Sequence, residues 1–211
     1  CTQDKIPISS SSDVQKEQDT LPEAEITPEE EPFLYGYQNL NEEEKTRYRQ
    51  ILAGIENYED SVTVEACSEE EINKVSNLVF VDHPEIFWLE QQNYSFNQKE
   101  NSDVDLLELN LVYNMGKDEI EDTKQQIEAK AEEWSQELSN CENEYDKIKY
   151  VYEFLGKNVL YDSESENNQN IQSVFLNQST VCMGFAKATQ YLLVRNGIFC
   201  TLVTGKVIPE N

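Results

Sequence analysis

The fold is decided by the stretch from Ser179 to Gly205, which has the sequence STVCMGFAKATQYLLVRNGIFCTLVTG. Ser179 and Thr180 are residue types that cap the N-termini of helices. From Cys182 onward, residues that prefer the interior recur at helical spacing. They predict one inward face made of Phe185, Ala186, Thr189, Leu192 and Leu193. The other side of the predicted helix holds Lys187, Gln190 and Arg195.

Gly197 follows this helix at the position where a left-handed residue commonly ends one. Beyond it, residues 198–203 are mostly apolar and predict a buried strand. The stretch therefore predicts a helix that begins near Cys182 and is followed by a strand.

Cys182 lies in the first turn of the predicted helix. Unpaired N–H groups and the helix dipole favour a thiolate there over a thiol. The same N–H groups could hold an oxyanion, and Gly184 would keep the approach to the sulfur open. A second interpretation stays open, because most free cysteines are small buried hydrophobes.

Two segments resemble a known family. The first is VCMGFAKA at 181–188, followed by LL at 192–193, GI at 197–198 and VTG at 203–205. The second runs from Asp146 to Asp162 and ends in NVLYD. Together they resemble the nucleophile segment and the preceding helix of the bacterial transglutaminase-like superfamily, over about residues 144 to 205.

The resemblance implies a papain-like core, with a cysteine at a helix N-terminus and a histidine and an aspartate on the antiparallel strands that follow. It implies acyl transfer through Cys182, as a peptidase, deamidase or cross-linking enzyme that acts on a protein or peptide substrate. The sequence has one histidine, His83, which precedes Pro84 and is predicted to lie in a turn with local hydrogen bonds. The chain ends at Asn211, before the strands that would carry the family's histidine and aspartate. We therefore expect a truncated core and a 211-residue chain that is catalytically weak or inactive.

Two other functions stay open beside acyl transfer. A non-catalytic surface lipoprotein would use the same domain to bind a protein or a cell-wall peptide. A truncated product without a function would leave residues 198–203 as an unpaired apolar edge, which favours aggregation.

Charge and cysteine content exclude several classes of function. The net charge is −26, from 42 acidic and 16 basic residues, and it repels nucleic acid and anionic membrane surfaces. No apolar run is long enough to span a bilayer. The five cysteines are irregularly spaced beside a single histidine, so we expect neither a disulfide framework nor a metal site. No pattern indicates an organic cofactor, and we expect a monomer.

Cys1 is the first residue, as in a mature bacterial lipoprotein after removal of the signal peptide. Residues 1–32 are polar and contain no aromatic residue, a composition that cannot offset the entropy lost on ordering. We therefore expect a lipid on Cys1 that anchors the protein through a flexible tether. The predicted location is the extracytoplasmic face of a bacterial cell membrane.

The remaining chain predicts an α+β protein in two parts. In a small α/β region at 33–115, Asn41 and Ser68 mark the starts of two helices, each with a glutamate three residues later. Residues 61–66 and 106–113 alternate as strands do. Residues 116–211 hold a long amphipathic helix and the two segments that resemble the family. We expect them to form the incomplete papain- or transglutaminase-like core.

Overall fold

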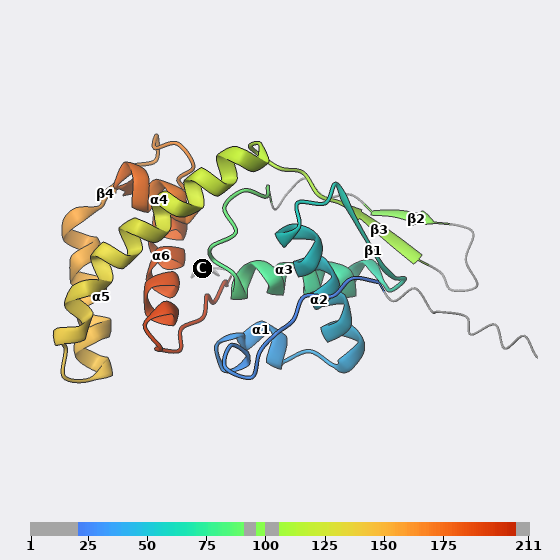
Figure 1. Ribbon diagram of the computed structural model, residues 1–211, viewed down its shortest axis with the longest axis horizontal. Helices are drawn as coiled ribbons and strands as arrows, with labels where there is room; N and C mark the ends of the chain where they lie inside the picture. Colours follow the sequence, from blue (N-terminus) through green and yellow to red (C-terminus); the bar gives the residue numbers. More distant parts are fainter. Residues whose placement is uncertain (1–20, 91–95, 100–105, 206–211) are drawn as a thin grey trace, which may run out of the picture.

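The computed structural model describes residues 21–90, the backbone of 96–99, and residues 106–205 (Figure 1). The helices are α1 (Tyr35–Gln38), α2 (Glu42–Glu56), α3 (Glu69–Asp82), α4 (Lys117–Ser135), α5 (Glu144–Asn158) and α6 (Cys182–Arg195). Short helical turns lie at η1 (Glu31–Phe33), η2 (Gln136–Asn140) and η3 (Ser173–Asn177). The strands are β1 (Ser61–Glu65), β2 (Phe96–Lys99), β3 (Leu106–Asn110), β4 (Leu160–Tyr161) and β5 (Ser179–Thr180). The predicted α+β class is confirmed as a mixture of helices and strands.

An antiparallel sheet with the strand order β1-β3-β2 forms one end of the molecule (Figure 1). β1 forms because Val62 and Val64 alternate with more polar residues, and both side chains are buried. In the ladder with β3, Val62 lies opposite Leu109 and Val64 lies opposite Leu107. The strands predicted at 61–66 and 106–113 are therefore confirmed over residues 61–65 and 106–110.

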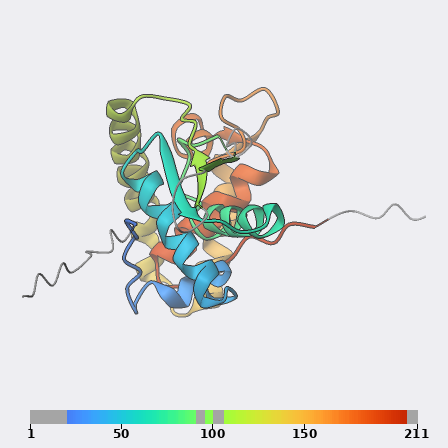
Figure 2. The same ribbon diagram turned by 90° about the vertical axis from the view of Figure 1, so that its right-hand side faces the viewer.

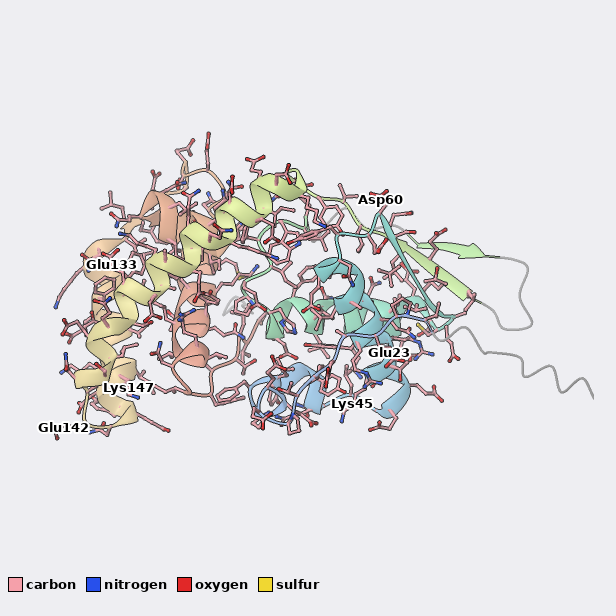
Figure 3. All side chains as sticks on the ribbon, viewed as in Figure 1. Glu23, Lys45, Asp60, Glu133, Glu142 and Lys147 are labelled. Atoms are coloured by element: carbon pink, nitrogen blue, oxygen red, sulfur yellow. The ribbon has the colours of Figure 1, made fainter. Side chains whose placement is uncertain are left out.

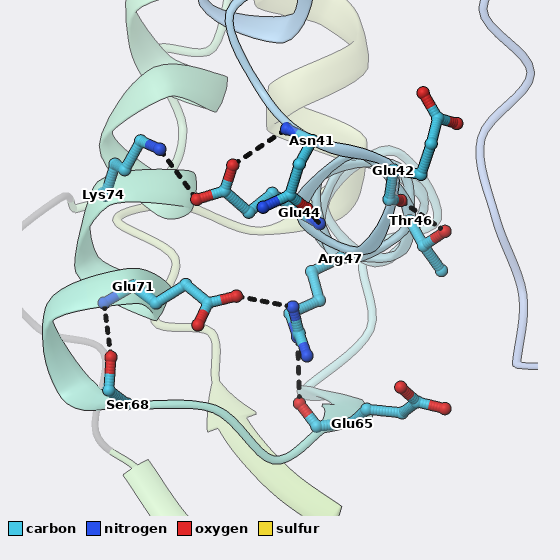
Figure 4. Close-up of polar contacts among 9 residues, drawn as sticks. All are labelled: Asn41, Glu42, Glu44, Thr46, Arg47, Glu65, Ser68, Glu71 and Lys74. Carbon is cyan, nitrogen blue, oxygen red and sulfur yellow. Dashed lines mark hydrogen bonds and ion pairs between the residues drawn. The ribbon is translucent and has the colours of Figure 1, made fainter.

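Polar contacts fix how α2, α3 and β1 meet (Figure 4). The predicted caps at Asn41 and Ser68 are confirmed, since each side chain accepts the backbone N–H three residues later. Arg47 of α2 joins the three elements, because its guanidinium donates to Glu71 on α3 and to the carbonyl of Glu65 on β1. These contacts hold the α2–α3 pair against the sheet.

Residues 21–32 are held against α2, although the sequence predicted a flexible tether as far as residue 32. The N–H of Ala24 donates to the carbonyl of Arg49 at 2.9 Å, and the Arg49 guanidinium lies 2.8 Å from Glu23. The amino-acid composition of residues 21–32 could not predict this contact, because a backbone hydrogen bond and an ion pair depend on residues elsewhere in the chain. Cys1 lies outside the described residues, so its lipid and the tether of residues 1–20 stay predictions.

The other end of the molecule is helical, and its layers are visible in two views (Figures 1 and 2). α5 packs along α6, and α4 is joined to α6 by polar contacts. An aromatic cluster fills the interior, where the ring of Trp134 lies 5.1 Å from Phe154 and 4.9 Å from Phe175 between centroids. The apolar segment before Cys182 thus enters the core as η3, where it packs against α6.

The surface of this end is charged. Figure 3 shows Glu133, Glu142 and Lys147 on the outer side of the helical layer, pointing away from it. Within the described residues, no helix has the length and apolarity needed to cross a membrane.

The strand predicted at 198–203 does not form. Ile198 is buried, but the chain beyond it has no regular structure, and the side chains of Phe199 and Val203 are 52% and 83% exposed. A strand needs a neighbour to complete its hydrogen bonds. No strand among the described residues pairs with this segment, so its apolar composition was not sufficient.

Candidate functional site

α6 begins where a short parallel ladder ends. β4 and β5 pair in parallel, and the N–H of Asp162 donates to the carbonyl of Thr180 at 2.8 Å. The chain then turns into the helix at Val181, the N-cap residue, whose backbone is extended. This junction places Cys182 at the first position of α6.

Ser179 and Thr180 do not cap α6, contrary to the sequence prediction. Both lie in β5, and among the described residues no side chain caps the first turn of α6. The hydroxyl of Thr180 is used in the interior, where it donates to the carbonyl of Asn168 and accepts from Ser173, both at 2.8 Å. The first N–H groups of a helix have no partner within it, so this end of α6 is open to an outside acceptor.

Gly184 lets α6 approach the segment that precedes it. A Cβ on Gly184 would lie 1.9 Å from Thr180 Oγ1 and 3.1 Å from the carbonyl oxygen of Asn168. The sequence predicted that this glycine keeps the approach to Cys182 open. The structure corrects this, because the space that the missing side chain leaves is filled by Thr180.

Cys182 is the first residue of α6, and its side chain is exposed with a free thiol. The predicted position in the first turn of a helix is therefore confirmed. Exposure does not fit the alternative in which this cysteine packs in the core. The sulfur lies at the end of the helix where the dipole favours negative charge. The role of nucleophile stays a prediction.

His83 ends α3 and is held by its neighbours. Its Nδ1 lies 2.8 Å from Glu85 Oε1, and its backbone N–H donates to the carbonyl of Val79. Burial opposes the charged imidazolium, but the nearby carboxylates of Glu85 and Asp82 raise the pKa of His83 above its ordinary value. The predicted turn with local hydrogen bonds is confirmed. No hydrogen bond or ion pair among the described residues joins His83 to Cys182.

Lys187 and Gln190 face inward, where the sequence predicted the outer side of the helix. Gln190 is buried, and its Nε2 donates to the carbonyl of Val81 at 2.7 Å, which ties α6 to α3. Lys187 is 6% exposed, and burial lowers the pKa of its ammonium. Arg195 lies on the other side as predicted, where it pairs with Glu128 of α4 at 2.6 Å.

The sequence contains a second helical pattern that predicts this inward face of α6. Met183, Lys187, Gln190 and Val194 are spaced i, i+4, i+7 and i+11, and the two ends of the stripe are apolar. A helix that packs against neighbours on more than one side can bury two stripes of residues. The apolar stripe predicted from the sequence was therefore only part of the buried surface of α6.

A pocket of about 790 Å³ lies beside the first two turns of α6. Its walls come from α3, the 86–90 segment, Asn114, the 167–170 loop, α6 and residues 202–204, and we call it the α3–α6 pocket. Met183 and Lys187 are the residues that α6 contributes, while Cys182 is not in the lining. The pocket therefore lies next to Cys182 in the sequence of α6, but the cysteine does not line it.

The described residues contain no group of three or more histidine, cysteine, aspartate or glutamate side chains that could hold a metal ion. The four described cysteines, Cys67, Cys141, Cys182 and Cys200, are free thiols. Burial raises the pKa of Cys67 and of Cys200, which makes these two thiols less reactive at neutral pH.

One comparison with known proteins matches the part of the chain that contains Cys182. Residues 132–211 match the profile of the transglutaminase-like superfamily, so the resemblance seen in the sequence is confirmed for the part that carries α5 and α6. No curated protein matches the chain. A solved structure described as the crystal structure of a TGase is 15% identical over 47% of this chain, with a TM-score of 0.31. The match covers 34% of that protein, so this chain spans about a third of its length.

Proposed function

We propose that Cys182 is the nucleophile of a cysteine acyl-transfer reaction of the transglutaminase type. One observation carries the proposal: a free, exposed thiol stands at the first position of a helix whose N-terminus no described side chain caps. The family match over residues 132–211 supports it, since that part of the chain contains Cys182.

The chemistry follows from this position. The thiolate attacks the carbonyl carbon of a carboxamide or peptide bond and a C–S bond forms. The C–N bond then breaks, and ammonia or the amine leaves with a proton taken from solvent. N–H groups of the first turn of α6 are placed to stabilise the oxyanion that forms in between. Water or a second amine then takes the acyl group and regenerates the thiol. The products are those of hydrolysis, deamidation or cross-linking.

The sequence contains a single histidine, and that histidine is bonded to Glu85 at the end of α3. We therefore propose acylation without efficient turnover for these 211 residues. A positioned acid or base contributes roughly 10²–10⁴ in rate, and its loss slows the attack on an unactivated amide most. The location at a bacterial surface and the protein or peptide substrate stay predictions from the sequence.

An activated ester tests the nucleophile without requiring a base. With p-nitrophenyl acetate, the thiolate takes the acetyl group, the aryl C–O bond breaks, and coloured p-nitrophenolate leaves. We expect a burst of about one equivalent of p-nitrophenolate per chain, because one exposed thiol lies at a helix N-terminus. Mass spectrometry of peptides should place the acetyl group on Cys182.

Two variants make the test specific. Cys182→Ser should remove the burst, whereas Cys200→Ser should retain it, because burial raises the pKa of Cys200 and keeps it a thiol. The rate should also fall when the chain is unfolded in urea, although unfolding exposes the sulfur further. A burst that survives in Cys182→Ser, or a rate that increases on unfolding, would overturn the proposal. The alternative of a non-catalytic binding protein predicts no burst and partner binding that survives Cys182→Ser.

A further inference from the structure

The α3–α6 pocket combines a cation with an apolar floor. Phe80, Ile86 and Phe87 lie in its lining, and each is at least nine-tenths buried. Lys187 reaches the pocket from α6 and is 6% exposed. A volume of about 790 Å³ lies within the range of pockets that hold small ligands.

Lys187 has no hydrogen bond or ion pair among the described residues. Burial is also the single cause of its lowered pKa, so no described carboxylate stabilises its charge. The stem of Lys187 is buried, whereas its Nζ is not among the fully enclosed polar atoms that lack a partner, so the ammonium opens onto the pocket. Proteins seldom leave a largely buried ammonium without a counter-charge, because desolvation is costly. An unpaired cation in the wall of a pocket therefore indicates an anionic ligand.

Asparagine side chains also line the pocket. Asn114 and Asn170 both donate their amide N–H to the carbonyl of Phe87, at 3.0 and 3.5 Å. The remaining oxygen of Asn114 accepts no hydrogen bond from the described residues. It is therefore able to accept the N–H of a ligand at the mouth of the pocket, since an amide side chain has both donor and acceptor groups.

We propose that the α3–α6 pocket binds the C-terminal end of a peptide whose last residue has an apolar side chain. The free carboxylate pairs with Lys187. The side chain packs on Phe80, Ile86 and Phe87, and the last peptide N–H donates to Asn114. A peptide C-terminus is the ligand that brings an anion, an apolar group and an amide N–H together within one residue.

The negative charge of the whole protein does not prevent this binding. Exposed charges are screened over about 8 Å at physiological ionic strength, whereas a buried cation is screened much less. Glu90 also lines the pocket, but it already interacts with another residue. Replacing it with glutamine removes a like charge from the wall and should tighten binding of the carboxylate.

Calorimetric titration of the full chain tests the proposal with two probes, acetyl-Ala-Leu and acetyl-Ala-leucinamide. They differ in the terminal carboxylate alone. We expect the acid to bind at least tenfold more tightly than the amide. Hexanoate, which has the carboxylate and an apolar tail without a peptide N–H, should bind more weakly than the acid.

Variants assign the effect to Lys187. In Lys187→Met the acid and the amide should bind equally, because the counter-ion is lost. Lys157→Met, at a lysine on α5 with a 73% exposed side chain, is the matched control and should retain the tenfold preference. Asn114→Asp, at an exposed position, should weaken binding of the acid by charge repulsion.

The proposal is overturned if the acid and the amide bind the unaltered chain equally, or if Lys187→Met keeps the preference. Binding of hexanoate as tight as that of the acid would also overturn it, in favour of a lipid carboxylate. These titrations contain no acyl-transfer step. A failure of binding would therefore leave the proposed reaction of Cys182 standing, and the reverse is equally true.

Discussion

Replacement of Gly184 by alanine tests how the first turn of α6 is held in place. The added Cβ would lie 1.9 Å from Thr180 Oγ1, far inside any real contact distance. Thr180 and Ser173 are both fully buried, and the Thr180 hydroxyl makes two hydrogen bonds of 2.8 Å. The clash can be relieved by a movement of Thr180 or by a shift of α6 away from β5.

The magnitude follows from three contributions. Alanine is favoured over glycine in a helix by about 1 kcal/mol, which would stabilise the variant. Overpacking costs roughly 1–3 kcal/mol, and each buried polar group that loses its partner costs roughly 1–3 kcal/mol more. We therefore expect Gly184→Ala to lower the free energy of unfolding by about 2–4 kcal/mol. For a chain of this length, the melting temperature should fall by roughly 5–15 °C.

Gly156→Ala is the matched control, because Gly156 lies on an exposed face of α5 where a Cβ would meet nothing within 4 Å. This change should stabilise the protein by roughly 0.5–1 kcal/mol. Urea titrations followed by circular dichroism measure both variants. If Gly184→Ala stabilises the chain as much as Gly156→Ala does, the close approach of Thr180 is wrong. A double variant with Thr180→Ala should be less destabilised than the two single changes predict together.

Three further predictions concern buried ionisable groups. Lys187→Met should raise the free energy of unfolding at pH 7 by about 1–2 kcal/mol, because an unpaired buried ammonium is replaced by an apolar chain. The lowered pKa of Lys187 means that this gain should disappear as the pH rises toward about 10.4, and a destabilised variant in urea titrations would contradict it. The pKa of His83 is raised, so His83 stabilises the fold below about pH 6.5, and this contribution is lost as the pH rises through its folded value. The chain should therefore lose stability relative to His83→Gln as the pH rises above about 6.5. A difference in urea midpoint between the two proteins that does not change with pH would refute this. Asp82→Asn should cost roughly 2–4 kcal/mol, because Asp82 accepts the N–H groups of Gly36 and Tyr37 at 2.8 Å with two oxygens and asparagine offers one. Near-ultraviolet circular dichroism and urea titration would show whether the α1 contact survives.

The parts of the fold that depend on local physics were visible in the sequence. The caps at Asn41 and Ser68 need one side chain and the backbone three residues later, so spacing was sufficient. Gly197 ends α6 with a positive φ of 76°, as its position predicted. Its N–H donates to the carbonyl of Val194, and the next N–H donates to Leu193, which closes the end of the helix.

The parts that depend on partners distant in sequence were not visible. The segment 198–203 has the composition of a strand, but composition does not provide the neighbouring strand. The segment 21–32 has the composition of a tether, yet a backbone bond and two ion pairs, Arg49–Glu23 and Lys45–Glu31, hold it to α2. Both errors have the same cause, since each depended on a contact made with another part of the chain.

The face of α6 that was wrongly predicted to point outward is also the face that borders the α3–α6 pocket. A helix with one apolar stripe can only pack, and polar residues on its other sides meet water. In α6 a second stripe contains Lys187 and Gln190, and Gln190 is bonded to α3. Because Gln190 fixes the helix from inside, the cation at Lys187 is kept beside the pocket, five residues along α6 from Cys182. A purely structural stripe would be more stable with an apolar residue at position 187, so the lysine indicates that the pocket has a ligand.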